Sequence, residues 1–149
     1  MAQTQAQIGY GTLLQREVAD ASPVSFQTIV EIAKIGAFGS KRALLDATHM
    51  QSPDGFMEYV LGLKDGVELA LEGNFRPDDD SQGEAAGLIN EHNTAHRSTY
   101  RIVLPGAFGA FTFSGLVVSW SATIDAAAVI KANFGIKITG AIHFDAFTA

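Results

Sequence analysis

The clearest pattern in this chain is the alternation of apolar and polar positions near its C-terminal end. Between residues 130 and 139 every second position is apolar or small, and the positions between include two lysines. Successive side chains of a strand point to opposite faces, so the pattern predicts a long strand with one buried face. Its expected inward residues are Ile130, Ala132, Phe134, Ile136 and Ile138.

Shorter apolar runs predict further strands upstream. We expect a short strand near residues 12–16, a long one over 25–38 and a short one within 43–49, followed by a turn at 52–55. The Asp65-Gly66 pair favours a tight turn, which predicts a hairpin over residues 55–77. The stretch PGAFGA predicts the turn of a second hairpin, over residues 98–124.

One segment changes to helical spacing. Ser81 is followed three residues later by Glu84, the spacing of a capping box, and Asp78 to Asp80 would complement the positive end of a helix. The expected apolar stripe is Ala85, Leu88, Ile89 and His92. The sequence therefore predicts one helix beginning at Ser81.

The stretch FTFSGLVVSWSATI, residues 111–124, places its large residues on both faces of a strand. Phe111 and Phe113 share one parity, whereas Leu116, Val118, Trp120 and Ile124 have the other, and the exchange falls at Gly115. We expect a bulge or bend at Gly115 that turns the two halves toward two apolar layers. One layer could belong to another chain; alternatively, a monomer bends there over its helix.

Together these elements predict a mainly β fold, an antiparallel β-sandwich or partly open barrel flanked by one α-helix. With 149 residues, the chain is expected to form a single domain, 1–149. The N-terminal segment, about residues 1–11, is rich in Gln, Gly and Ala and predicts either an extended arm or terminal disorder.

Composition adds an expectation of self-association. Apolar residues make up 47% of the chain and charged residues only 17%, with ten Phe, so part of the apolar surface is expected to meet another chain. The net charge of −6 disfavours tight DNA binding, which needs a basic surface. No signal peptide and no membrane anchor are expected, which predicts a soluble intracellular product.

No arrangement of side chains indicates catalysis or a cofactor. His92 and His96 have the i, i+4 spacing of helical metal ligands, but no glutamate lies between them. Asp78, Asp80 and Gln82 resemble the start of a calcium loop that lacks its twelfth-position carboxylate. Without cysteine, the chain has no thiolate nucleophile or ligand. We expect neither enzyme activity nor a metal site.

Three long stretches, taken in order, are similar to the major tail tube protein of long-tailed bacteriophages with non-contractile tails. They are LLDATHMQSPDGFMEYVLGLKDGVELALEGNFRPDDD, YRIVLPGAFGAFTFSGLVVSWSATI and IKANFGIKITGAIHF. The resemblance extends from about Gly9 to Phe144. Other family members can carry an additional C-terminal immunoglobulin-like domain, which we expect this chain to lack.

The resemblance implies a structural role in the virion tail. Subunits of this family form hexameric rings that stack into a hollow tube around a tape-measure protein, between tail tip or initiator and terminator proteins. Assembly would take place in the host cytoplasm, and DNA would pass through the lumen without specific binding. No cofactor is implied.

Two groups of residues follow from this resemblance as site candidates. Glu68 and Glu72, and then Glu31, are expected to line the lumen and repel DNA; alternatively they pair across strands with Lys131 or Lys137. The segment 38–50 is expected to stack rings together with the N-terminal arm, unless it is an ordinary mobile loop. Its candidate residues are Phe38, Lys41, Arg42, Leu44, Leu45, Asp46 and Met50.

Two other interpretations remain open at the level of sequence. The chain could be the inner tube protein of a contractile tail or of a secretion-type injection machine. It could also be a monomeric β-sandwich module that binds a ligand, which would need a concave aromatic patch.

Overall fold

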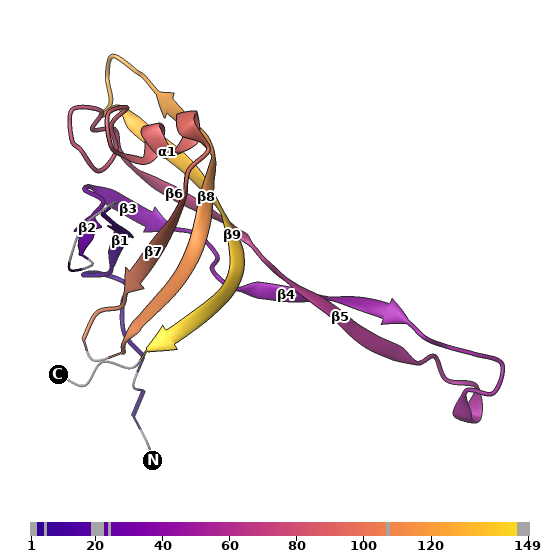
Figure 1. Cartoon of the computed structure of the whole chain (residues 1–149). Coiled ribbons are helices and arrows are strands. Elements are labelled where there is room, and N and C mark those ends of the chain that lie inside the picture. Colours follow the sequence, from indigo (N-terminus) through magenta and orange to yellow (C-terminus); the bar gives the residue numbers. More distant parts are fainter. Residues whose placement is uncertain (1–2, 5, 19–22, 24, 107, 146–149) are drawn as a thin grey trace.

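The computed structural model describes residues 3–4, 6–18, 23, 25–106 and 108–145. Seven strands form one antiparallel sheet in the order β2-β1-β7-β8-β9-β6-β3. They are β1 (Leu13–Glu17), β2 (Phe26–Thr28), β3 (Ile32–Ile35), β6 (Glu68–Asn74), β7 (Arg97–Val103), β8 (Ala110–Thr123) and β9 (Lys131–Asp145). The sheet curls so that its two edges approach each other, which makes a partly open barrel (Figure 1). The predicted mainly β fold with one helix is confirmed.

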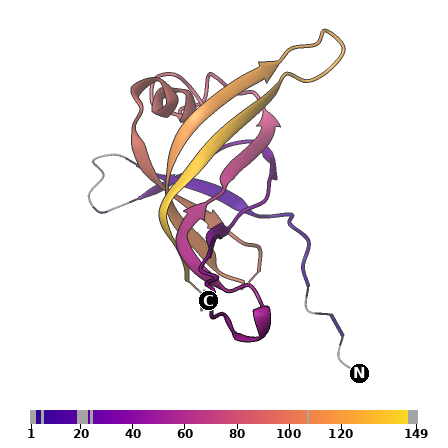
Figure 2. The same ribbon diagram turned by 90° about the vertical axis from the view of Figure 1, so that its right-hand side faces the viewer.

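A second, two-stranded sheet leaves this barrel as a long projection (Figure 1), which points toward the viewer in Figure 2. It consists of β4 (Ser40–Asp46) and β5 (Tyr59–Gly66), joined by a segment that contains the short 3-10 helix η1 (Pro53–Gly55). The strand and the turn predicted in this region are confirmed. We call β4, β5 and their connection, residues 40–66, the projecting hairpin.

The predicted hairpin around Asp65-Gly66 is wrong. β5 continues almost directly into β6, and the two strands have different partners: β5 pairs with β4, whereas β6 pairs with β9 and β3. Gly66 does not have the positive φ of a tight turn. A Cβ there would lie 2.7 Å from the Ile138 Cβ of β9, so the glycine is needed for close approach of two strands.

The long strand predicted over 25–38 is interrupted. Glu31 has a φ of 55°, in the left-handed region, and separates β2 from β3. β2 pairs with β1 at one edge of the sheet, and β3 pairs with β6 at the other. The break therefore lets the chain cross between the two edges. No glycine or proline marks it in the sequence.

The helix α1 spans only Leu88–Thr94, and the predicted start at Ser81 is wrong. The Ser81 hydroxyl accepts a hydrogen bond from the Val30 N–H and donates one to Asp79, so it caps no helix. The buried Gln82 amide donates to the carbonyl oxygens of Val30 and Asn74. Residues 77–87 thus use their polar side chains to satisfy neighbouring backbone groups. Ala85 is exposed, whereas Leu88 and Ile89 are buried as expected.

The core fills the inside of the barrel with side chains from most of its strands. Its buried apolar residues include Leu14, Leu69, Leu71, Tyr100, Ile102, Phe113, Phe134, Ile136 and Ile138. The alternation predicted for β9 is confirmed from Ala132 to Ile138, whereas Ile130 is substantially exposed. Apolar residues of the projecting hairpin are absent from this described core.

The predicted bulge at Gly115 is also wrong in its position. Gly115 pairs regularly with Ser98 of β7 and Ile138 of β9. The register between β8 and β9 shifts on either side of it, between Thr112 and Ser114 and between Val117 and Ser119. A Cβ on Gly115 would lie 2.6 Å from the Ile136 Cγ2, so this glycine serves dense packing.

The aromatic residues of β8 have three different environments. Phe113 is buried in the core, as expected. The ring of Phe111 packs between those of Phe38 and Phe144, with centroid distances of 4.9 and 4.8 Å. Trp120 stacks on Phe75 at 6.3 Å yet remains 39% exposed. The exchange of faces along β8 follows the shift after Val117, which puts Trp120 opposite Phe134.

Candidate assembly surface

The projecting hairpin carries apolar side chains that nothing in the barrel covers. Its exposed large residues are Leu44, Leu45, Met50, Phe56, Met57, Tyr59, Val60, Leu61 and Leu63. An isolated two-stranded ribbon is marginally stable in water at best, because it cannot bury enough apolar surface. Large exposed apolar patches mark interaction sites in folded proteins. This hairpin is therefore the strongest candidate surface for assembly.

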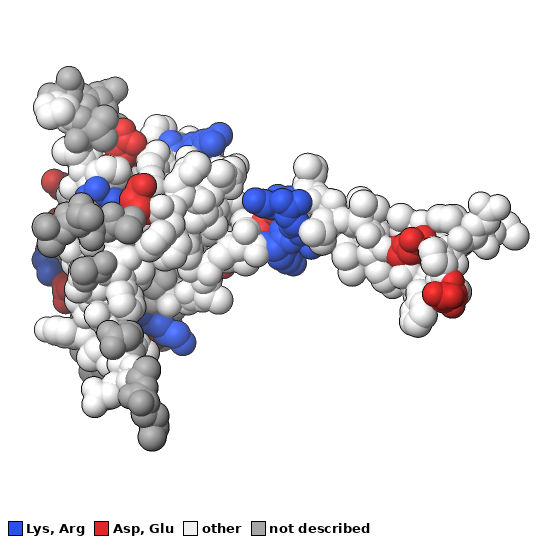
Figure 3. Space-filling model, turned by 90° about the horizontal axis from the view of Figure 1, so that it is seen from below, with Lys and Arg blue, Asp and Glu red and all other residues white. Residues whose placement is uncertain are grey.

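Charge is divided along the projecting hairpin. Lys41, Arg42 and Lys64 lie at its base, with Arg42 paired in register with Lys64. Asp65, which pairs with Lys137 at 3.0 Å, also lies at the base, whereas Asp46, Asp54 and Glu58 lie farther out. Figure 3 shows the basic group near the barrel and the acidic groups toward the far end of the projection.

Local hydrogen bonds order the end of the hairpin. The Asp46 carboxylate accepts from the Thr48 N–H at 2.9 Å, and its bonds with Thr48 hold the pKa of Asp46 below its usual value. The Ser52 hydroxyl donates to Glu58 at 2.6 Å, and the His49 Nε2 lies 3.2 Å from the same carboxylate oxygen. The exposed Met50, Phe56 and Met57 thus project from an ordered connection.

The predicted ring-stacking residues are mostly on this hairpin. Lys41, Arg42, Leu44, Leu45 and Asp46 belong to β4, and Met50 lies in the connection. Phe38 does not project, because its ring packs on Phe111 and Phe113 at the barrel.

Sequence reasoning missed the other half of the same surface, from Phe56 to Leu63, because it paired that run with β6. The stretch FMEYVLGL has apolar residues at both parities. A strand with one solvated face would alternate between apolar and polar residues instead. The apolar residues at both parities were therefore the sequence signal for a strand outside the barrel.

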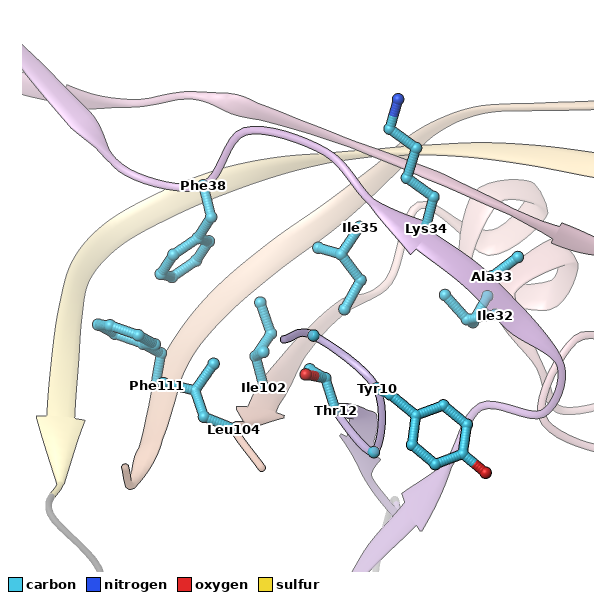
Figure 4. Close-up of a pocket in the computed structure, with 12 residues that line it drawn as sticks. Tyr10, Thr12, Ile32, Ala33, Lys34, Ile35, Phe38, Ile102, Leu104 and Phe111 are labelled. Carbon is cyan, nitrogen blue, oxygen red and sulfur yellow. The ribbon is translucent and has the colours of Figure 1, made fainter. Parts of the chain in front are cut away.

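A pocket of about 830 Å³ lies where the two edges of the barrel approach each other. Figure 4 shows its apolar side chains, which come from β3, from the ends of β7 and β8 and from the segment before β1. They include Tyr10, Ile32, Ile35, Phe38, Ile102, Leu104 and Phe111. Among the described residues that line it, Lys34 alone is charged. This pocket has no local signal in the sequence, because its walls come from distant parts of the chain.

The lumen candidates lie on the outer face of the sheet, away from the core. Glu68 and Glu72 are exposed on β6, opposite Lys137 and Asn133 of β9. Among the described residues, neither glutamate forms an ion pair: Lys137 binds Asp65 at 3.0 Å, and Lys131 donates to Asn74.

Glu31 differs from the other two lumen candidates because its charge is paired. It accepts hydrogen bonds from Arg76 at 2.7 Å and Asn74 at 3.2 Å, which hold the pKa of Glu31 below its usual value. The outer face of β6 and its neighbours thus keeps two unpaired carboxylates in addition to exposed lysines.

A buried polar cluster attaches α1 to the barrel. The Arg16 guanidinium of β1 donates to Glu91 of α1 at 2.6 Å and also to the Ala86 carbonyl. The Ser98 hydroxyl of β7 donates to Glu91 at 2.9 Å, and the His96 Nδ1 lies 3.0 Å from the other carboxylate oxygen. His96 is thus part of a structural cluster, whereas the His92 Nδ1 lies 3.2 Å from the Val117 carbonyl.

Searches for other kinds of site gave no candidate within the described part of the chain. No group of three or more potential metal-ligating side chains was found there. Across the same ranges, every helix is too short or too polar to cross a membrane.

Comparisons with known proteins agree with this geometry. The family model described as lambda phage tail tube protein, TTP, matches residues 11–144. The search of curated proteins finds no match.

Solved structures from several tails and injection systems share the fold. The tail of an empty gene transfer agent (GTA) particle, refined with C6 symmetry, has a TM-score of 0.75 and 19% identity, with 95% of this chain and 100% of that chain covered. The SPP1 tail tube has a TM-score of 0.71 and 11% identity, with 95% and 80% covered.

A structure of the PVC sheath/tube terminator, from an extracellular contractile injection system, has a TM-score of 0.72 and 10% identity, with 97% and 100% covered. At these identities the structural matches show a shared fold, whereas the family model covers most of the sequence. The chain therefore belongs to the lambda phage tail tube protein family, and it is a structural component of a phage tail tube rather than an enzyme.

Proposed function

We propose that the chain polymerises as stacked hexameric rings into a hollow tube that conducts phage DNA to the host. The observation that carries this proposal is the projecting hairpin, whose apolar side chains have no partner in the barrel. The C6 symmetry of the similar GTA tail supports six subunits per ring. We infer that the hairpin reaches a subunit of the neighbouring ring and that residues 1–11 add to this contact as an arm.

The proposal includes further partners. A tape-measure protein would occupy the bore during assembly in the host cytoplasm, and tip or initiator and terminator proteins would bound the tube. Contacts between different surfaces of identical subunits form open filaments when they do not close into a ring, and a stacked tube needs such contacts along its axis. An interface of about 1,600 Å² in total per contact is typical of stable, specific association.

Electron microscopy of the concentrated, purified protein tests the proposal directly. We expect hollow filaments or six-membered rings, either from the protein alone or after an initiator complex is added. A protein that stays monomeric at high concentration and in the presence of that complex would contradict the proposal and favour a monomeric module.

The exposed carboxylates of β6 supply a second prediction. A wall that conducts DNA must not hold phosphates, and carboxylates repel them over about 8 Å at physiological ionic strength. We expect virions that carry both Glu68→Lys and Glu72→Lys to assemble tails of normal length but to release DNA more slowly. Release can be followed by fluorescence of a DNA-binding dye after triggering.

Asp125→Lys is the matched control for this prediction, because Asp125 is exposed in the loop between β8 and β9. If the double variant and the control release DNA at the unaltered rate, Glu68 and Glu72 do not line the lumen. Glu31 is a weaker choice for this test, since its charge is already paired with Arg76.

The inner tube of a contractile machine is the second candidate, and its supporting observation is the fold shared with contractile injection systems. The two candidates differ in whether a sheath surrounds the tube. A gene for a sheath protein next to the gene for this chain would favour the contractile machine.

A further inference from the structure

We propose that the end of the projecting hairpin of one subunit inserts into the apolar pocket beside β3 of a second copy of this chain. This inference rests on the proposed polymerisation and names the two surfaces that would meet. We call residues 47–58 the hairpin tip, and the pocket that contains Ile32, Phe38 and Phe111 in its lining the β3 pocket.

The hairpin tip has the properties of an inserting element. Met50, Phe56 and Met57 are exposed side chains on a connection that local hydrogen bonds already order. A preordered element loses less conformational entropy on binding than a flexible loop does. In the isolated subunit these three apolar side chains face water, so their burial would favour association.

The β3 pocket has the properties of a receptor. With a volume of about 830 Å³, it can accept several large side chains. Its walls are mainly apolar, and apart from residues 9–12 they come from the barrel or pack against it, with Ile102 within the core and Phe38 packed on it. The receptor is therefore built on a rigid part of the fold.

The hairpin tip of the same subunit cannot fill the β3 pocket. Phe38, at the pocket, directly precedes the base of the hairpin, and β4 then extends for seven residues away from the barrel (Figure 1). At about 3.3 Å per residue, the tip lies roughly 20 Å from its own pocket. A hairpin tip that fills this pocket therefore belongs to another copy.

The polarity of the two surfaces favours this pairing. Lys34 lies opposite Glu72 of β6, on the outer face of the sheet, and its side chain points away from the other labelled side chains in Figure 4. Among the described residues that line the pocket none is acidic, so the surface that faces the cavity is mainly apolar. Such a surface matches the exposed Met50, Phe56 and Met57 of the hairpin tip.

Because tip and pocket are different surfaces of one subunit, each copy can give its tip to one neighbour and receive a tip from another. Such head-to-tail contacts propagate without limit unless they close. We assign this contact to successive rings along the tube axis.

Crosslinking can test the assignment, because the sequence contains no cysteine. The test variant carries Thr12→Cys in the pocket and Met57→Cys in the tip; the control carries Met57→Cys with Ala127→Cys, in the exposed loop between β8 and β9. Both are assembled and oxidised with diamide, which removes two hydrogens from a pair of thiols. We expect the test variant to give a ladder of disulfide-linked oligomers well beyond six subunits, and the control none.

Each outcome is decisive. Tubes without a ladder, a ladder that stops at six, or equal ladders in both variants would overturn the axial tip-in-pocket contact while leaving the proposed tube intact. Failure of the unsubstituted chain to form tubes, even with an initiator complex, would overturn the proposed function itself.

Discussion

Shortening the projecting hairpin is expected to abolish polymerisation while the barrel stays folded. Because Arg42 pairs with Lys64, residues 43–63 can be replaced by Asn-Gly, which forms a two-residue turn between these positions. The buried core contains no residue of the removed segment, so its packing is preserved. The exposed apolar side chains from Leu44 to Leu63, which we infer to join subunits, are all removed.

Size-exclusion chromatography and electron microscopy measure this effect, and thermal unfolding followed by circular dichroism checks the fold. We expect a monomer with a cooperative transition and no tubes. A full-length chain with Leu45→Ser and Leu61→Ser is the matched variant, because it keeps the length of the hairpin but lowers its apolar surface; weakened assembly is expected. Tubes of the shortened chain would show that the hairpin is dispensable.

Glu91→Gln is expected to destabilise the fold by about 3 to 5 kcal/mol, because it leaves the Arg16 guanidinium buried without its counter-charge. The side chains of Arg16 and Glu91 are only 9% and 4% exposed, and their ion pair joins β1 to α1. The other described acceptors of the Arg16 guanidinium, the Gln27 side chain and the Ala86 carbonyl, are neutral and cannot supply the lost charge. Ser98 and His96 also bind the Glu91 carboxylate, so their contacts change as well.

Urea unfolding of the unassembled subunit measures this loss. Glu72→Gln, at an exposed position, is the control and should change the free energy of unfolding by no more than about 0.5 kcal/mol. Replacing both Arg16 and Glu91 by Met should cost less than Glu91→Gln, since no buried charge is then left alone. A loss below about 1 kcal/mol for Glu91→Gln would contradict a tightly coupled buried pair.

The fold class was predictable because strands with one buried and one solvated face show an alternation of apolar and polar residues. The alternation from Ala132 to Ile138 marks β9, and the turn residues near Pro105 and Gly106 separate β7 from β8. These patterns involve only residues close in sequence, so they can be recognised without knowledge of the tertiary structure.

Strand partners were not predictable in the same way. Asp65-Gly66 is typical of a hairpin turn, yet this glycine serves the close approach of β9 at Ile138. Ser81 and Glu84 match a helix start, yet the Ser81 hydroxyl serves the backbone of Val30. In both cases the residue type can have a local role or a role in a contact between distant segments, and the prediction chose the local role.

The candidate assembly surface was likewise predictable only in part. The segment 38–50 was predicted from its mixture of apolar and charged residues. Its pairing with residues 59–66 depends on the register of two strands, which the sequence does not show. The β3 pocket forms only because the fold brings Tyr10, Ile35 and Phe111 together. The sequence by itself determined the antiparallel β class, the acidic balance and the apolar surplus, since these follow from composition and short-range periodicity. Only the tertiary structure decided where that surplus is exposed, because exposure depends on which distant strands cover each face, and none of the described strands of the barrel covers the projecting hairpin.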